Sequence, residues 1–366
     1  FGPQYTAATG TSLLEGYRKQ GRWPLWLFAI LTAATMFSVQ AAVTVVTAGL
    51  AIVLFGLEAS PVAVSGVLMA VCAGLLRIGE FRWLDRAVKA LVVVLSICTF
   101  VSTALALSRV DFSQSLVPSA TVLSDDATIF FIAALVGWMP APIDISVWQS
   151  LWTLARQHDT GHRATLKETL LDYHIGYVGT GLLALCFMLM GAGVMYGSGI
   201  EFAEAAGPFA SQIIALYTTT LGPWSGPIVA IAAFAVMFST TLTVIDGFAR
   251  AVAVLLERLK GPESSEAVEP AAREGTRVYW ATLASLALGA LAVLSLLTSS
   301  LKAMVDIATT ASFLTAPLLA VLNHRAVHGP EVPPAFRPSS GLWAMSWAGI
   351  VFLTTFAGYY VWLRYL

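Results

Sequence analysis

The sequence predicts an all-α polytopic membrane protein. Hydrophobic residues make up 57% of the chain and charged residues only 11%, whereas about a quarter of the residues in a soluble domain are charged. The apolar residues form runs of membrane-spanning length, separated by short polar stretches. One run, at 127–154, is interrupted by Gly137-Trp138-Met139-Pro140-Ala141-Pro142-Ile143-Asp144. Because proline removes a backbone donor and clashes with the preceding turn, this helix must break near its middle.

The apolar runs predict nine spans in a single transmembrane domain, 1–366. Residues 1–22 are too charged to span the membrane and are expected to form the end of a preceding helix followed by a loop. Residues 207–222 form a shorter stretch, which we expect to be a surface helix on the external side. The spans are expected at 24–56, 61–79, 84–107, 127–154, 171–196, 224–255, 278–297, 303–323 and 341–363.

Basic residues predict the orientation of the chain. Lys and Arg are concentrated in 18–22, 77–89, 156–167, 250–277 and 325–337, whereas the loops at 56–60, 108–126 and 197–223 contain only Arg109. Because cytoplasmic loops carry the excess of basic residues, the first group is assigned to the cytoplasm. We therefore expect a multi-pass protein of the plasma (inner) membrane whose chain starts inside and ends outside.

Composition and motifs exclude several classes of function. The formal net charge is −1 and the basic residues are in short clusters, so no nucleic-acid partner is expected. There is no phosphate-binding loop or nucleophile motif, and we predict neither an enzyme nor a bound cofactor. The three cysteines lie in apolar runs and are interpreted as small buried hydrophobes. The five histidines are in or next to predicted cytoplasmic loops and are expected to be solvated; they are His158, His162, His174, His324 and His328.

The broken span is the candidate binding site. Lipid cannot hydrogen-bond the released backbone groups, so such a break has to be buried in protein or line a cavity. Pro140 releases the carbonyl groups of Val136 and Gly137, which could bind a cation. Pro142 suits the first position of the resumed helix, which would place Asp144 in its first turn. There Asp144 could interact with the helix dipole or attract a cation, and the sequence leaves both roles open.

The motif Trp138-Met139-Pro140 resembles the Met-Pro-His break in the sixth helix of the Nramp (natural resistance-associated macrophage protein) divalent-metal transporters. Residues 9–14, 238–248 and 313–319 resemble the second, eighth and tenth helices of that family. The resemblance implies a LeuT-like inverted-repeat fold, with an incomplete first repeat at 1–107, a second repeat at 127–323 and an extra helix at 341–363. Asp-Pro-Gly-Asn, the family's first helix break, does not occur, so we expect a divergent, bacterial-like member that lacks its N-terminal helices.

The resemblance implies that Met139, Asp306 and Thr309 are metal ligands, and with Val136, Gly137 and Asp144 at the break they complete the predicted set. The Met139 thioether would favour soft divalent ions over Ca²⁺ and Mg²⁺, although a Met beside prolines can also fill a gap in an apolar bundle. Asp306 could donate oxygen ligands with Thr309, or it could pair with Lys302 four residues earlier. A similar intrahelical pair is expected between Asp246 and Arg250.

These residues predict a secondary transporter that moves a divalent metal cation, Mn or Fe in kind, by alternating access. The usual proton route is not expected, because Ala141 replaces the histidine and 36–41 offers only Ser38 and Gln40 in place of acids. Two alternatives stay open: a transporter of Mg or a small organic solute such as an amino acid, and a receptor or assembly subunit without transport. The expected partners are the metal cation and the lipid bilayer, and no obligatory protein partner is evident.

Overall fold

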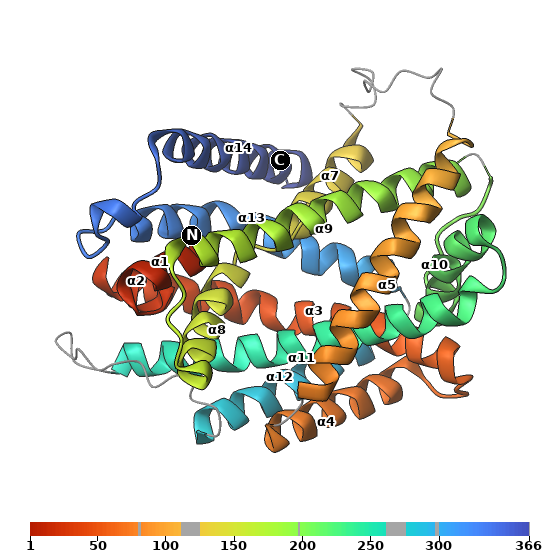
Figure 1. Cartoon of the computed structure of the whole chain (residues 1–366), viewed down its shortest axis with the longest axis horizontal. Coiled ribbons are helices and arrows are strands. Elements are labelled where there is room, and N and C mark those ends of the chain that lie inside the picture. Colours follow the sequence, from red (N-terminus) through yellow and green to blue (C-terminus); the bar gives the residue numbers. More distant parts are fainter. Residues whose placement is uncertain (80–81, 111–124, 197, 261–275, 297–299, 366) are drawn as a thin grey trace.

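The computed structural model describes residues 1–79, 82–110, 125–196, 198–260, 276–296 and 300–365. These residues form a helical bundle (Figure 1). In chain order the helices are α1 (Gly2–Thr9), α2 (Leu13–Lys19), α3 (Arg22–Phe55), α4 (Pro61–Ile78), α5 (Arg82–Leu107), α7 (Asp126–Trp138), α8 (Ile145–Thr160), α9 (Leu166–Val194), α10 (Ala206–Leu221), α11 (Ser225–Lys260), α12 (Arg277–Leu296), α13 (Leu301–Val327) and α14 (Ser340–Tyr365), with a 3₁₀ turn at Pro334–Phe336.

Eight of these helices are long and apolar enough to cross a membrane: α3, α4, α5, α9, α11, α12, α13 and α14. The remaining predicted span, 127–154, which is the fourth in chain order, is divided between α7 and α8, and each of these helices is too short to cross alone. The described residues therefore confirm a polytopic helical membrane protein. Most of the predicted loop at 108–126 and of the polar linker at 258–277 lies outside the described residues.

The two longest helices, α3 and α11, lie side by side through the middle of the bundle (Figure 1). The hydroxyl groups of Thr47 and Thr241 are 2.8 Å apart, and Thr47 also donates to the carbonyl oxygen of Met237 at 3.1 Å. Hydroxyls that bond across helices satisfy polar groups which lipid cannot solvate. At the edge of the bundle, α9 and α14 leave nearly all of their side chains exposed or half-buried, as expected for surfaces that face acyl chains.

Two sequence predictions are corrected by this fold. Residues 1–22 form two short helices, α1 and α2, instead of one helix end and a loop; Gly10, with φ of 71°, makes the left-handed turn that ends α1. His324 is not solvated, because α13 continues past the predicted end of its span, at residue 323, to Val327. Within this longer helix His324 is only 6% exposed. Its Nδ1 lies 2.9 Å from the hydroxyl of Ser346 on α14.

Candidate functional site

The broken span has the expected local chemistry. Helix α7 ends at Trp138, and the amide of Met139 makes the last bond of the helix, to the carbonyl oxygen of Leu135 at 2.9 Å. The next donor would be residue 140, but proline has no N–H. Among the described residues no donor reaches the carbonyl oxygens of Val136 or Gly137. Two backbone acceptors are therefore left open at the point where the helix unwinds.

Helix α13 fixes the end of α7. Gly137 is buried and lies so close to α13 that a Cβ atom there would overlap the carbonyl oxygen of Thr309. One residue later, the indole N–H of Trp138 donates to the hydroxyl of Ser312 at 2.9 Å. Thr309 and Ser312 are one turn apart on α13, so two consecutive residues of α7 are held by one face of that helix. These contacts place the open carbonyls and Met139.

Met139 is the most exposed of the predicted ligands on the broken span. Met139 is 39% exposed. A methionine that fills a gap in a packed core would be largely buried. A thioether sulfur is a soft ligand with no competing hydrogen bonds to break. Met139 and the two open carbonyls are adjacent in the chain, and together they offer sulfur and oxygen atoms to a cation.

Asp144 differs from the sequence prediction. Helix α8 begins at Ile145, so Pro142 is not the first helical residue and Asp144 occupies the N-cap position. Its side chain makes no capping bond, and its Oδ1 atom is buried without a hydrogen-bond partner among the described residues. A buried carboxylate oxygen is costly unless a donor or a cation compensates it. The N-terminal turn of α8 supplies only part of that compensation.

A chain of polar side chains that the sequence analysis missed leads to the start of α8. The hydroxyl of Tyr17 on α2 donates to Oδ1 of Asn323 on α13 at 2.5 Å, and the amide group of Asn323 donates to the hydroxyl of Ser146 at 2.8 Å. Ser146 in turn donates to the carbonyl oxygen of Ile143 in the break. The signal in the sequence was an asparagine at the end of an apolar span, since polar residues at such positions usually bond to a neighbouring helix.

The two remaining predicted ligands lie on α13. The hydroxyl of Thr309 is buried and donates to carbonyl oxygens of its own helix, at 2.8 Å for Val305 and 3.2 Å for Asp306. The carboxylate of Asp306 is exposed one turn before Thr309. Lys302 makes no direct ion pair with Asp306 within the described residues, but its charge still acts on this carboxylate, so the predicted pairing is present only at longer range.

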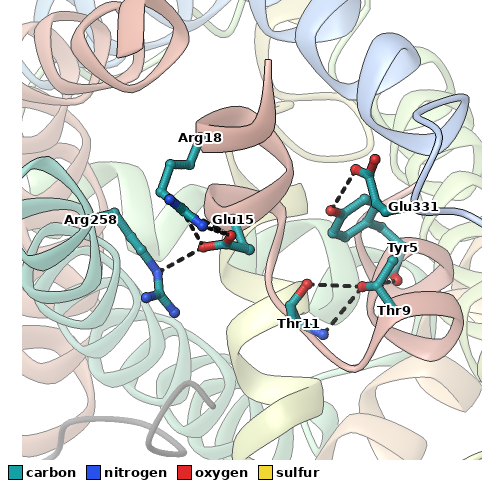
Figure 2. A network of polar contacts seen from close by, with 7 residues as sticks. All are labelled: Tyr5, Thr9, Thr11, Glu15, Arg18, Arg258 and Glu331. Atoms are coloured by element: carbon teal, nitrogen blue, oxygen red, sulfur yellow. Dashed lines mark hydrogen bonds and ion pairs between the residues drawn. The ribbon is translucent and has the colours of Figure 1, made fainter. Parts of the chain in front are cut away.

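Polar contacts also join α1 and α2 to the ends of α11 and α13 (Figure 2). Glu15 on α2 binds Arg18 of the same helix and lies 3.2 Å from Nε of Arg258 near the end of α11. The hydroxyl of Tyr5 on α1 donates to Glu331, which follows α13, at 2.9 Å. Because Glu15 and Arg258 are almost fully buried, this pair is shielded from solvent more than a surface ion pair would be. No group of three or more His, Cys, Asp or Glu side chains suited to a metal occurs in the described part of the chain.

Several helices of membrane-spanning length and a helix break with open backbone acceptors are typical of polytopic membrane transporters. Residues 6–363 match the family described as "Natural resistance-associated macrophage protein-like". The chain therefore belongs to this family of divalent-metal transporters, which are not enzymes. It is also 32% identical to "Uncharacterized protein PM0681" of Pasteurella multocida (strain Pm70), over 97% of this chain and 79% of that protein.

Proposed function

We propose that this protein is a secondary transporter that carries a soft divalent cation, Mn²⁺ or Fe²⁺ in kind, across the plasma (inner) membrane. The observation that carries the proposal is the pair of open carbonyls at Val136 and Gly137, three and two residues before the exposed Met139. The carbonyls would replace part of the ion's hydration shell, and the thioether would favour a soft ion over Mg²⁺.

The proposed ion site includes Asp144 across the break. Its buried, unpartnered Oδ1 supports this role, because a divalent cation would neutralise the carboxylate. Thr309 borders the site through the close approach of its backbone to Gly137. Asp306, exposed one turn away, is proposed as an outer position that attracts the ion before it reaches the break.

The different packing of the two half-helices supports alternating access. Helix α7 packs on α13 and α14, whereas α8 packs on α1, α2 and α11. Groups of helices that hold opposite halves of a broken helix can rock against each other and open the site to either side in turn. The mechanism we propose keeps the ion at the break while α8 and its neighbours move relative to α7 and α13.

Coupling to protons by the family's usual route is not part of this proposal. Ala141 replaces the histidine beside Met139, and α3 carries Gln40 at the depth where acids would be expected. Gln40 is fully buried and donates to the hydroxyl of Thr44 at 2.9 Å. A carboxamide side chain has no ionisation near neutral pH, so this position cannot relay a proton by titration. We propose transport down the metal gradient or coupling to another ion.

The proposal is tested with Mn²⁺ and Mg²⁺ uptake by the purified protein in proteoliposomes. Met139→Ala should reduce the preference for Mn²⁺ over Mg²⁺ about tenfold, because the soft ligand is lost. The matched control is Met345→Ala on α14, since Met345 is 67% exposed and far along the chain from the break. It should leave the preference unchanged.

Three outcomes would redirect the assignment. An unchanged preference in Met139→Ala removes this sulfur from the site. A wild-type protein that carries Mg²⁺ or an amino acid but not Mn²⁺ favours the alternative substrates. No tracer flux of any kind favours a receptor or assembly subunit.

A further inference from the structure

Asp246 on α11 lies at the centre of a buried hydrogen-bond network that joins three helices. Its Oδ2 atom accepts from Nε of Arg250 at 2.7 Å and from the indole N–H of Trp152 at 3.0 Å, and its Oδ1 accepts from the hydroxyl of Tyr279 at 2.7 Å. Asp246, Arg250 and Tyr279 are each at most 7% exposed. The predicted intrahelical pair with Arg250 is thus confirmed, but it is buried and has partners on two other helices.

The three donors have different relations to Asp246. Arg250 is four residues further along α11, and Tyr279 is on α12, which packs along α11. Trp152 comes from α8, the half-helix that follows the break and begins with Asp144 at its N-cap. If α8 moves away from α11, the Trp152 bond is lost, while the other two donors can stay bound to the carboxylate.

A second, independent contact shows how closely α8 lies against α11 beside Asp246. A Cβ atom at Gly247 would be 2.7 Å from Cδ2 of Trp148, so only glycine admits this indole ring. The same ring meets Phe248 edge to face, with the centroids 4.5 Å apart. Trp148 and Trp152 are one turn apart on α8, and they form the face by which α8 contacts residues 246–248.

We propose that Asp246 is a positioning residue for the ion site: through Trp152 it holds α8, and with it Asp144, in the place observed here. Release of Trp152 loosens the hold of α11 on α8 without leaving the buried charge uncompensated, because Arg250 and Tyr279 still donate to it. A buried carboxylate with a single partner could not release that partner at low cost. Because Asp246 has three donors, the hydrogen bond from Trp152 on α8 can break while the carboxylate keeps two hydrogen-bond partners.

The test compares two variants that each remove one hydrogen bond from the same carboxylate. Trp152→Phe removes the donor from α8, and Tyr279→Phe removes the donor from α12. A hydrogen bond to a charged group corresponds to a factor of about ten or more in an equilibrium. In lipid nanodiscs, we expect amide hydrogen exchange of α8 to become about tenfold faster in Trp152→Phe. Exchange of α8 should stay as in the wild type in Tyr279→Phe.

Transport gives a second readout, which rests on the proposed function. Trp152→Phe should raise KM for Mn²⁺ about tenfold, because Asp144 is no longer held across the break. The preference for Mn²⁺ over Mg²⁺ should not change, because Met139 precedes α8. Tyr279→Phe should leave KM within about twofold of the wild type. Thermal stability should fall similarly in both variants, so a purely structural role predicts no difference between them.

Equal effects of the two variants on α8 exchange, or no effect of either, would overturn the positioning role. If Trp152→Phe does not fold, Gly247→Ala provides the same test, since its added methyl group must push Trp148 and α8 away from α11. Faster exchange of α8 in a protein whose wild type carries no Mn²⁺ would refute the proposed function and leave the positioning role standing.

Discussion

Gly137→Ala tests whether the close contact between α7 and α13 builds the ion site. The added Cβ would overlap the carbonyl oxygen of Thr309 and lie 3.2 Å from Cβ of Phe313. Because the obstacle is backbone, no side-chain rotation can relieve it, and the end of α7 has to shift. Forcing an extra methyl group into such a contact costs about 1–3 kcal/mol.

The matched control is Gly181→Ala on α9, where a Cβ meets nothing within 4 Å. Both alanines gain about 0.5–1 kcal/mol because alanine is the better helix former. That gain cancels in the comparison, so the two variants should differ by about 1–3 kcal/mol. At about 2 °C per kcal/mol, Gly137→Ala should unfold about 2–6 °C below Gly181→Ala.

The assay combines thermal unfolding in detergent with Mn²⁺ uptake in proteoliposomes. A shift of α7 displaces the carbonyls of Val136 and Gly137 together with Met139, so KM for Mn²⁺ should rise about tenfold in Gly137→Ala. Gly181→Ala should transport like the wild type. If the two variants have the same melting temperature and the same KM, the contact with Thr309 does not position the site.

Two further predictions concern charges. Asp144→Asn should lower Mn²⁺ uptake about tenfold without loss of thermal stability, since the buried carboxylate oxygen lacks a hydrogen-bond partner. The control is Asp125→Asn at the exposed N-cap of α7. Equal uptake by the two variants would remove Asp144 from the site. Glu15→Gln should destabilise the protein by about 1.5–3 kcal/mol, because Arg258 loses a buried carboxylate. Glu331→Gln removes one charged acceptor from the hydroxyl of Tyr5 and should lower the free energy of unfolding by less, as measured by thermal unfolding. If Glu15→Gln lowers it by an equal or smaller amount, the buried Glu15–Arg258 pair does not have the role given to it.

Part of the candidate site could be predicted from local chemistry. Two prolines, a glycine and an acid within an apolar run identify the break, because the missing N–H groups are a covalent property of proline. The open carbonyls at Val136 and Gly137 follow from the same fact. The first residue of α8 could not be predicted to within a few positions, and Asp144 proved to be the N-cap instead of a first-turn residue.

Partners across helices could not be predicted, because a linear pattern does not specify which faces meet. The pairing of Asp246 with Arg250 was predicted from their spacing, but the bonds to Trp152 and Tyr279 depend on how α8 and α12 pack on α11. His324 was expected in solvent and is buried against α14 for the same reason. Spacing along one helix is local information, whereas contacts between helices are not.

The sequence by itself determined that the chain lies in a membrane, where its spans lie and where one of them breaks. These features follow from the thickness and low polarity of lipid, which constrain each segment independently of the others. Only the tertiary structure decided three contacts between helices. Gly137 packs against the backbone of Thr309, Asn323 donates a hydrogen bond to Ser146, and Asp246 accepts one from Trp152. Those contacts arise from the close packing of several helices at once, and shape complementarity between distant segments cannot be read from any single segment.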